Sequence, residues 1–130
     1  MLEKGELTLP DEDTDRLMYA ETKRILGEAG FRRYEISNYA RPGFCCRHNC
    51  VYWTRQNYLG LGIGAASLIE NVRFRNGDDL SSYQEHPLNC LEEIHALSLE
   101  EQMEEFMFLG LRLTKGVDVS AFRENFGRMP

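Results

Sequence analysis

Residues with the chemistry of metal ligands are concentrated in the stretch "CCRHNCVYW", residues 45–53, which holds Cys45, Cys46, Cys50 and His48. Thiolates and imidazoles are the side chains that bind zinc, about four at a time in a tetrahedral site. If the stretch is extended, His48 and Cys50 share a face with Tyr52, but ligands spaced by two residues spread over roughly 13 Å at about 3.3 Å per residue. We therefore expect no zinc site here.

The four cysteines favour other roles. Cys45, Cys50 and Cys90 read as small hydrophobic residues, because free cysteines are often buried. No two cysteines have the two-residue gap of a C-x2-C pair, which an iron–sulfur site would favour. We therefore expect the purified chain to carry no stoichiometric metal.

The same stretch lies in a basic island within an acidic chain. Residues 31–58 contain five arginines and one acidic residue, Glu35, whereas the whole chain has a formal net charge of -6. The acidic total argues against nucleic-acid binding. Arginine forks bind carboxylates in bidentate fashion, so the island suits a small anionic ligand, although arginines solvated on loop surfaces are the simpler alternative.

Length and composition predict a globular domain. The 130 residues are enough to bury a hydrophobic core, and 42% are hydrophobic against 28% charged. No apolar run approaches the roughly 20 residues of a membrane span. The N-terminal "MLEKGELTLPDEDTD" is acidic and lacks the apolar centre of a signal peptide. We expect a cytoplasmic protein whose cysteines stay reduced.

The first half of the chain alternates helix and strand signals. Pro10 and the acidic run after it predict a helix of about 17 residues, capped by Asp11 or Asp13 and closed by Gly30. "RYEISNYA" predicts a strand over residues 33–40. A glycine-rich strand should follow, then a turn near Glu70 and Asn71 and a short strand over residues 72–75.

The second half is predicted to be mainly helical. Asp78 or Asp79 can cap a short helix that ends before Pro87. Ser98 and Glu101 form a capping box for a longer helix. A last helix covers residues 118–126, and we expect the two final helices to expose apolar side chains that favour a homo-oligomer of this fragment: Met103, Phe106, Met107, Phe122 and Phe126.

Several motifs together carry a family resemblance: "YEISNYARPGFCCRHNCVYW", "YLGLGIGAAS", "RFRN" and "LSLEEQMEEFMFLGLRLTKGVDVSAF". In this order they resemble the C-terminal portion of oxygen-independent coproporphyrinogen III oxidase-like radical-SAM proteins, the HemN/HemW family, and most closely the HemW-type haem chaperones. The resemblance implies an α+β or α/β fold: the last helix–strand elements of a partial (β/α) barrel in residues 1–77 and the start of a mainly helical C-terminal domain in residues 78–130.

The resemblance also implies a haem site. His48, Asn49, Tyr52 and Trp53 fill the family's HNxxYW motif, which is associated with haem binding. It implies His48 as a ligand of the haem iron, with Arg41 and Arg47 meeting the propionates. The open alternative is a structural histidine satisfied by a loop carbonyl.

A second implied site lies in "GLGIGAAS", which is similar to the family's late glycine-rich strand near S-adenosylmethionine. Cofactor contacts are then implied for Gly62, Gly64, Ala65 and Ala66. In the chaperone-like branch this strand usually ends Gly-Ala-His-Gly, so no role of that histidine carries over to Ala66.

The function implied is that of a fragment of a radical-SAM protein of haem metabolism, of the haem-chaperone type. The first alternative is the oxidase proper, which decarboxylates coproporphyrinogen III to protoporphyrinogen IX. The second is a small zinc-binding or interaction module. Because the family's C-x3-C-x2-C motif is absent from these residues, the 4Fe–4S cluster and S-adenosylmethionine are expected only in the full-length parent, and the fragment alone should be inactive.

Overall fold

The computed structural model describes residues 9–130, which form two compact units, one ending at Cys45 and the other spanning Cys46–Pro130. All strand pairings in the described part are antiparallel, so the α+β alternative is confirmed. The first eight residues, on which part of the signal-peptide argument depends, lie outside the described range. The boundary between residues 77 and 78 remains a prediction.

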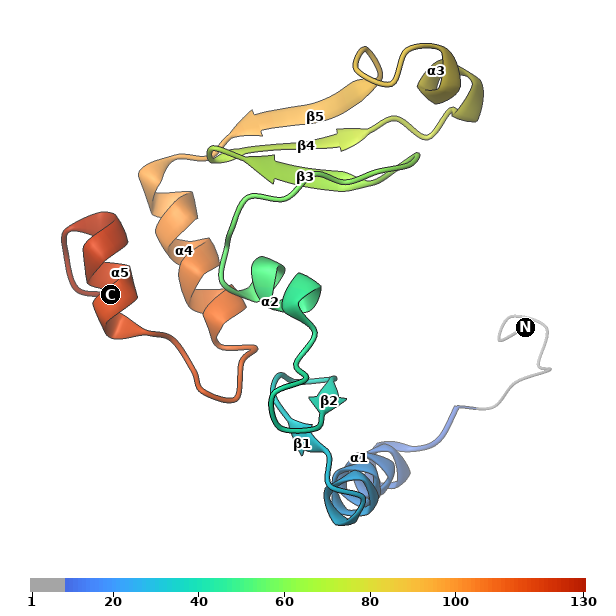
Figure 1. The fold of residues 1–130 in the computed structure, drawn as a ribbon, viewed down its shortest axis with the longest axis vertical. Coiled ribbons are helices and arrows are strands. Elements are labelled where there is room, and N and C mark those ends of the chain that lie inside the picture. The colour runs from blue at the N-terminus through green and yellow to red at the C-terminus, as the bar shows by residue number, and fades with distance from the viewer. Residues whose placement is uncertain (1–8) are drawn as a thin grey trace. The chain divides into compact units, whose positions relative to one another are not determined.

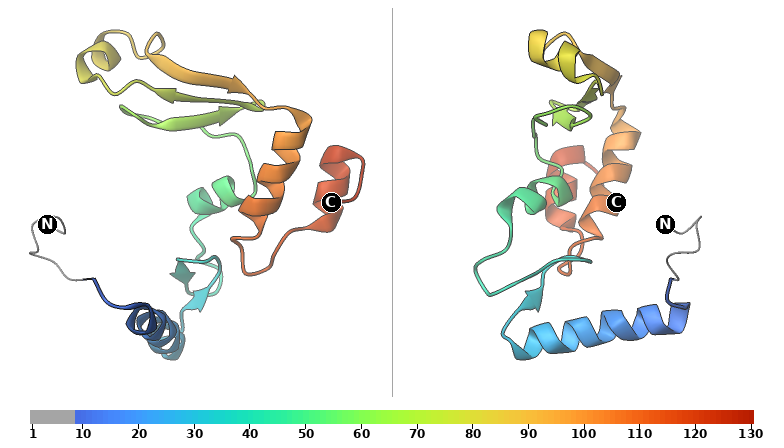
Figure 2. Two further views of the ribbon diagram at one scale, coloured as in Figure 1. Left: turned by 180° about the vertical axis from the view of Figure 1, so that it is seen from behind. Right: turned by 90° about the vertical axis from the view of Figure 1, so that its right-hand side faces the viewer.

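The first unit consists of one long helix and a small strand pair (Figure 1). Helix α1, Glu12–Glu28, is seen from the side in the right-hand view of Figure 2. The carboxylate of Asp11 accepts the backbone N–H of Thr14 at 2.7 Å, so the predicted helix and its cap are confirmed.

The expected strand over residues 33–40 is wrong. Strands β1, Arg32–Arg33, and β2, Tyr39–Ala40, are short and pair with each other across a loop. Glu35 lies fully buried in that loop, where its carboxylate accepts the backbone N–H of Ser37 at 2.8 Å and the side-chain amide of Asn38 at 2.6 Å. These bonds hold the chain in a loop instead of a continuous strand.

The second unit contains a three-stranded sheet in the order β3–β4–β5. Strands β3, Ala66–Ile69, and β4, Val72–Asn76, form a hairpin, and its turn at Glu70 and Asn71 lies where the sequence predicts it. Both turn residues have positive φ. Strand β5, Leu91–Ala96, pairs with β4 and was not predicted, because its side chains are mostly exposed and polar.

Four helices complete this unit: α2, Arg47–Trp53; α3, Leu80–Glu85; α4, Leu99–Gly110; and α5, Val119–Phe126. The capping box of Ser98 and Glu101 begins α4, and Asp79 caps α3, as the sequence predicts. Helix α4 contacts both α2 and α5 (Figure 1). Within the described residues, every helix is too short or too polar to cross a membrane.

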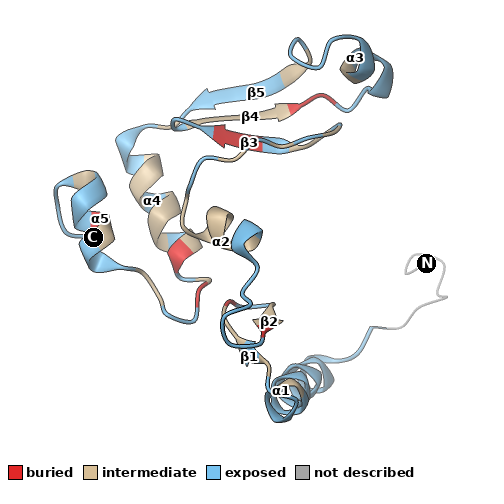
Figure 3. Ribbon diagram, viewed as in Figure 1, coloured by how far each residue is buried: buried red, intermediate tan, exposed pale blue. Residues whose placement is uncertain are grey.

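Two small cores stabilise the second unit (Figure 3). Leu68 is buried in β3, and Phe122 of α5 is only 2% exposed. The ring of Phe122 meets Phe106 at 5.5 Å and Phe126 at 4.8 Å between centroids. The predicted exposure is therefore wrong for Phe122, which is buried, while Phe106 and Phe126 are half-buried where α4 and α5 pack against each other.

Candidate porphyrin pocket

The central motif "RHNCVYW" is a helix, α2, and the expected extended conformation is wrong. Cys46 is its N-cap residue but makes no side-chain capping bond. Seven residues of middling helix propensity do not form a stable helix alone, so its contacts with α4 stabilise it. The helix changes which residues share a face: His48 now lies one turn before Tyr52.

His48 and Tyr52 interact directly. The Tyr52 hydroxyl lies 2.7 Å from Nε2 of His48, and their rings meet edge to face at 4.8 Å between centroids. The ring of Tyr52 also packs edge to face on Tyr58, 4.6 Å away. These three rings form one aromatic wall, and His48 at its end is solvent-exposed.

This wall lines an open pocket of about 540 Å³. The opposite side comes from the glycine-rich loop that precedes β3. The pocket is lined by His48, Tyr52, Tyr58, Leu59, Gly60, Leu61, Ala65 and Ala66. Apart from the imidazole and two phenol groups, its side chains are aliphatic. The tertiary structure thus brings both predicted sites, the HNxxYW motif and the glycine-rich segment, to one pocket.

The glycine-rich segment is a tightly held loop, not the predicted strand. A methyl group added at Gly60 would overlap the carbonyl oxygen of Ala66, so only glycine fits there. The buried hydroxyl of Ser67 accepts the Gly60 N–H at 3.0 Å. The Asn76 side-chain amide donates to the carbonyls of Gly60 and Gly62, the latter at 2.7 Å.

The backbone N–H groups of Gly62 and Gly64, the two glycines predicted to contact the cofactor, form hydrogen bonds within the fold. Gly62 N–H donates to the Tyr83 hydroxyl at 2.9 Å, and Gly64 N–H donates to the carbonyl of Gly77 at 3.2 Å. Gly62 and Gly64 do not line the pocket, whereas Ala65 and Ala66 do. Any contact from this segment to a ligand in the pocket therefore has to come from Gly60, Leu61 or the two alanines.

The other predicted site residues lie away from the pocket lining. Trp53 packs under the guanidinium of Arg112, 4.2 Å from the ring centroid, and lines a separate cavity of about 190 Å³ with residues of α4 and α5. Asn49 is half-buried and Arg47 exposed, both on α2. Arg41 lies in the first unit, over the ring of Phe31.

The pocket has the size and lining of a small-ligand site. Its volume is in the ordinary range for ligand pockets, about 300–1,000 Å³, and its lining is mainly apolar with one imidazole. Imidazole is a common axial ligand of haem iron. These residues fit haem, with the condition that Nε2 of His48 is already engaged by Tyr52.

The cysteines of the motif do not gather into a metal site. No three metal-ligating side chains within residues 9–130 are placed to hold one ion. Cys45 and Cys46 are exposed, Cys50 is half-buried, and no disulfide joins any of the four cysteines, all of which the structure describes.

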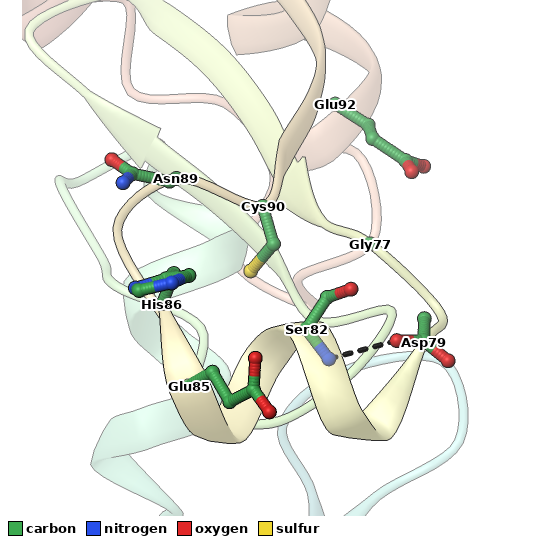
Figure 4. Close-up of a pocket in the computed structure, with 8 residues that line it drawn as sticks. All are labelled: Gly77, Asp79, Ser82, Glu85, His86, Asn89, Cys90 and Glu92. Carbon is green, nitrogen blue, oxygen red and sulfur yellow. Dashed lines mark hydrogen bonds between the residues drawn. The ribbon is translucent and has the colours of Figure 1, made fainter.

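A further cavity of about 320 Å³ lies beside α3, where His86, Cys90 and Asp79 line it (Figure 4). Three of its polar side chains, Asp79, Cys90 and Glu92, have structural partners. Asp79 accepts the Ser82 N–H at 2.7 Å, which lowers the pKa of Asp79, and the thiol of Cys90 donates to the carbonyl of Pro87. Glu92 is paired with Arg75. This cavity is therefore shaped by the cap of α3 and the turn into β5.

Sequence reasoning missed several residues that build the pocket at His48: Tyr58, Leu59, Leu61, Ser67 and Asn76. The available signal was the aromatic and aliphatic pattern of "NYLGLGIG", which reads as an ordinary buried strand. Asn76 sits in "NGDD" and reads as a turn residue, although it is buried and binds the glycine-rich loop.

Comparison with known proteins identifies relatives over nearly the whole chain. The haem chaperone HemW of Lactococcus lactis is 38% identical over 124 residues, covering 95% of this chain and 33% of that protein. HemW of Bacillus subtilis is 37% identical over 98% of this chain and 35% of its own length. The chain thus spans about a third of the length of the curated relatives it matches.

A domain family and a solved structure agree with these relatives. Residues 97–129 match the HemN C-terminal domain. The structure of coproporphyrinogen III oxidase (HemN) from Escherichia coli, a radical SAM enzyme, superposes with a TM-score of 0.70 at 19% identity, over 92% of this chain and 31% of that one. The solved structure establishes the fold alone. In sequence and in fold, the chain therefore corresponds to a C-terminal portion of the HemN/HemW family of radical-SAM proteins.

Proposed function

We propose that this chain is part of a haem-chaperone-type radical-SAM protein and that the pocket at His48 receives haem. The observation that carries the proposal is the exposed imidazole at the mouth of a pocket whose walls are aromatic and aliphatic. The HemW relatives, named as haem chaperones, favour the same ligand. We also propose a cytoplasmic location, because none of the four cysteines is joined by a disulfide.

Each of these residues would contribute to haem binding in a different way. His48 would supply the axial nitrogen, and haem supplies the iron that accepts it. Tyr52 and Tyr58 offer ring surface, and Ala65 and Ala66 leave room on the other wall for a flat macrocycle. Arg47, one residue before His48, is proposed to pair with a propionate. Asn49 and Trp53 would support α2 from its other faces.

S-adenosylmethionine and a 4Fe–4S cluster are proposed for the full-length parent only. The cluster cysteines are not in this sequence, and no radical chemistry is assigned to its residues. Among the cofactor residues implied by the resemblance, Ala65 and Ala66 remain the stronger candidates, since they line the pocket and Gly62 and Gly64 do not.

The alternative is the oxidase itself, in which the same pocket would take coproporphyrinogen III for decarboxylation. The fold match to HemN favours it. A porphyrinogen carries no iron, so His48 would then have no metal ion to coordinate. The zinc-binding or interaction module draws no support from the family relationship.

The test is a haemin titration of the full-length parent, followed at the Soret band. His48→Ala should weaken binding at least tenfold, whereas His86→Ala, at an exposed histidine of the cavity beside α3, should not. Both are repeated in a Cys46→Ser, Cys50→Ser background, because a thiolate could replace the lost imidazole. Unchanged binding by His48→Ala in both backgrounds would rule out the ligand role and favour the oxidase.

A further inference from the structure

The hydroxyl of Tyr52 is hydrogen-bonded to Nε2 of His48, the nitrogen that would have to bind iron. The hydroxyl oxygen lies 2.7 Å from Nε2 of His48, a short distance for a hydrogen bond that involves a ring nitrogen. Residues four apart on a helix face each other, so α2 itself brings the two side chains together. A histidine bonded in this way does not present Nε2 freely to the pocket.

The position of Tyr52 is supported by residues from two other elements. Its ring packs edge to face on Tyr58. The Tyr58 hydroxyl accepts from Arg73 of β4 at 3.3 Å, and Arg73 pairs with Glu105 of α4 at 2.7 Å. This series of contacts restrains the phenol of Tyr52 against the sheet and α4. The bond to His48 is therefore part of the packed structure and not a chance contact between two mobile side chains.

We infer that Tyr52 masks Nε2 of His48, so that its hydroxyl competes with iron, or with any other electrophile, for that nitrogen. Nε2 has one bonding direction in the ring plane, which serves either a hydrogen bond or a coordinate bond. For iron, this inference rests on the proposed function, and it makes Tyr52 a residue that limits affinity and eases release. Cargo can then leave when the hydroxyl returns to the nitrogen.

The masking can be measured without haem. Diethyl pyrocarbonate transfers an ethoxycarbonyl group to a neutral imidazole nitrogen, and the leaving group departs as ethanol and carbon dioxide. Mass spectrometry of peptides from the intact chain would give the rate at His48 relative to His86. Tyr52→Phe keeps the ring and removes the hydroxyl. The ratio of the modification rate at His48 to that at His86 should therefore rise about 2- to 10-fold, which corresponds to the net free energy of one ordinary hydrogen bond.

Tyr58→Phe is the matched control, because it removes the neighbouring hydroxyl that binds Arg73 but keeps the ring that packs directly on Tyr52. It should leave the ratio at His48 unchanged. His95, which lies 2.8 Å from Glu101, gives a second internal reference in every sample. A ratio that does not rise in Tyr52→Phe, or that rises equally in Tyr58→Phe, would overturn the masking.

Haemin titration of the parent then separates the two proposals. Tyr52→Phe should bind haemin about 2- to 10-fold more tightly than the unaltered protein. If His48→Ala binds haemin normally, the ligand role fails, while the reactivity result still decides the masking. If His48→Ala loses binding but Tyr52→Phe binds no tighter, the hydroxyl does not compete with iron and the inference fails at this site.

Discussion

Arg55 and Glu105 lie 50 residues apart in the sequence and form an ion pair of 3.1 Å in which both side chains are largely buried. The other oxygen of Glu105 binds Arg73 at 2.7 Å. A third bond runs from Arg55 to the side chain of Asn71 in the β3–β4 turn. One carboxylate therefore joins the residues that follow α2 and strand β4 of the sheet to α4.

Replacing the carboxylate of Glu105 should lower the free energy of unfolding. Glu105→Gln leaves two arginines without their charge partner, and removing one member of a buried pair costs about 3 kcal/mol or more. Urea unfolding should show the loss in the free energy of unfolding. Glu104→Gln, at an exposed neighbouring position, should stay within about 0.5 kcal/mol of the unaltered chain. Equal effects of the two substitutions would contradict the structural role of Glu105.

Gly60 is expected to tolerate no side chain. Gly60→Ala places a methyl group against the carbonyl oxygen of Ala66, and such overpacking costs about 1–3 kcal/mol. Gly27→Ala in α1 meets no neighbour and should stabilise the helix by about 0.5–1 kcal/mol. Thermal unfolding followed by circular dichroism would compare them. A stabilising Gly60→Ala would show that the loop does not approach β3 so closely.

The capping box of α4 should give the protein a specific acid dependence. Bonding to the backbone N–H of Ser98, then to the His95 side chain, lowers the pKa of Glu101 to about 2. A lowered pKa stabilises the fold above the unfolded value, about 4.3, and this stabilisation is lost as the pH falls toward about 2. Urea midpoints between pH 5 and pH 2.5 should therefore fall more steeply for the unaltered chain than for Glu101→Gln. Parallel slopes would exclude this contribution.

The chain is expected to self-associate through apolar side chains that the structure leaves exposed. Leu17, Met18 and Ile25 of α1 are each more than half exposed. The phenylalanines that we named on α4 and α5 pack together, so we expect association to involve α1, while Leu99 and Phe108 of α4 also stay exposed. Sedimentation velocity at tens of micromolar should show a dimer or larger species, which Leu17→Glu with Ile25→Lys should dissociate. A monomer in the unaltered chain would remove this expectation.

Local signals in the sequence were sufficient for the elements that local chemistry determines. The cap at Asp11, the turn at Glu70 and Asn71, and the capping box of Ser98 and Glu101 all lie where they were predicted. Each depends on bonds between residues at most four apart, so the sequence alone carries the information. The family motifs were recognisable for a similar reason, since they are short runs in a fixed order.

Only the tertiary structure decided the conformation of "RHNCVYW" and the composition of the pocket. The motif has no strong propensity, and its contacts with α4 make it a helix, which turns His48 toward Tyr52 and Trp53 toward Arg112. The pocket joins α2 to a loop that Ser67 and Asn76 hold, with ion pairs spanning up to 50 residues. Such contacts depend on long-range packing, which no local pattern of residues reports.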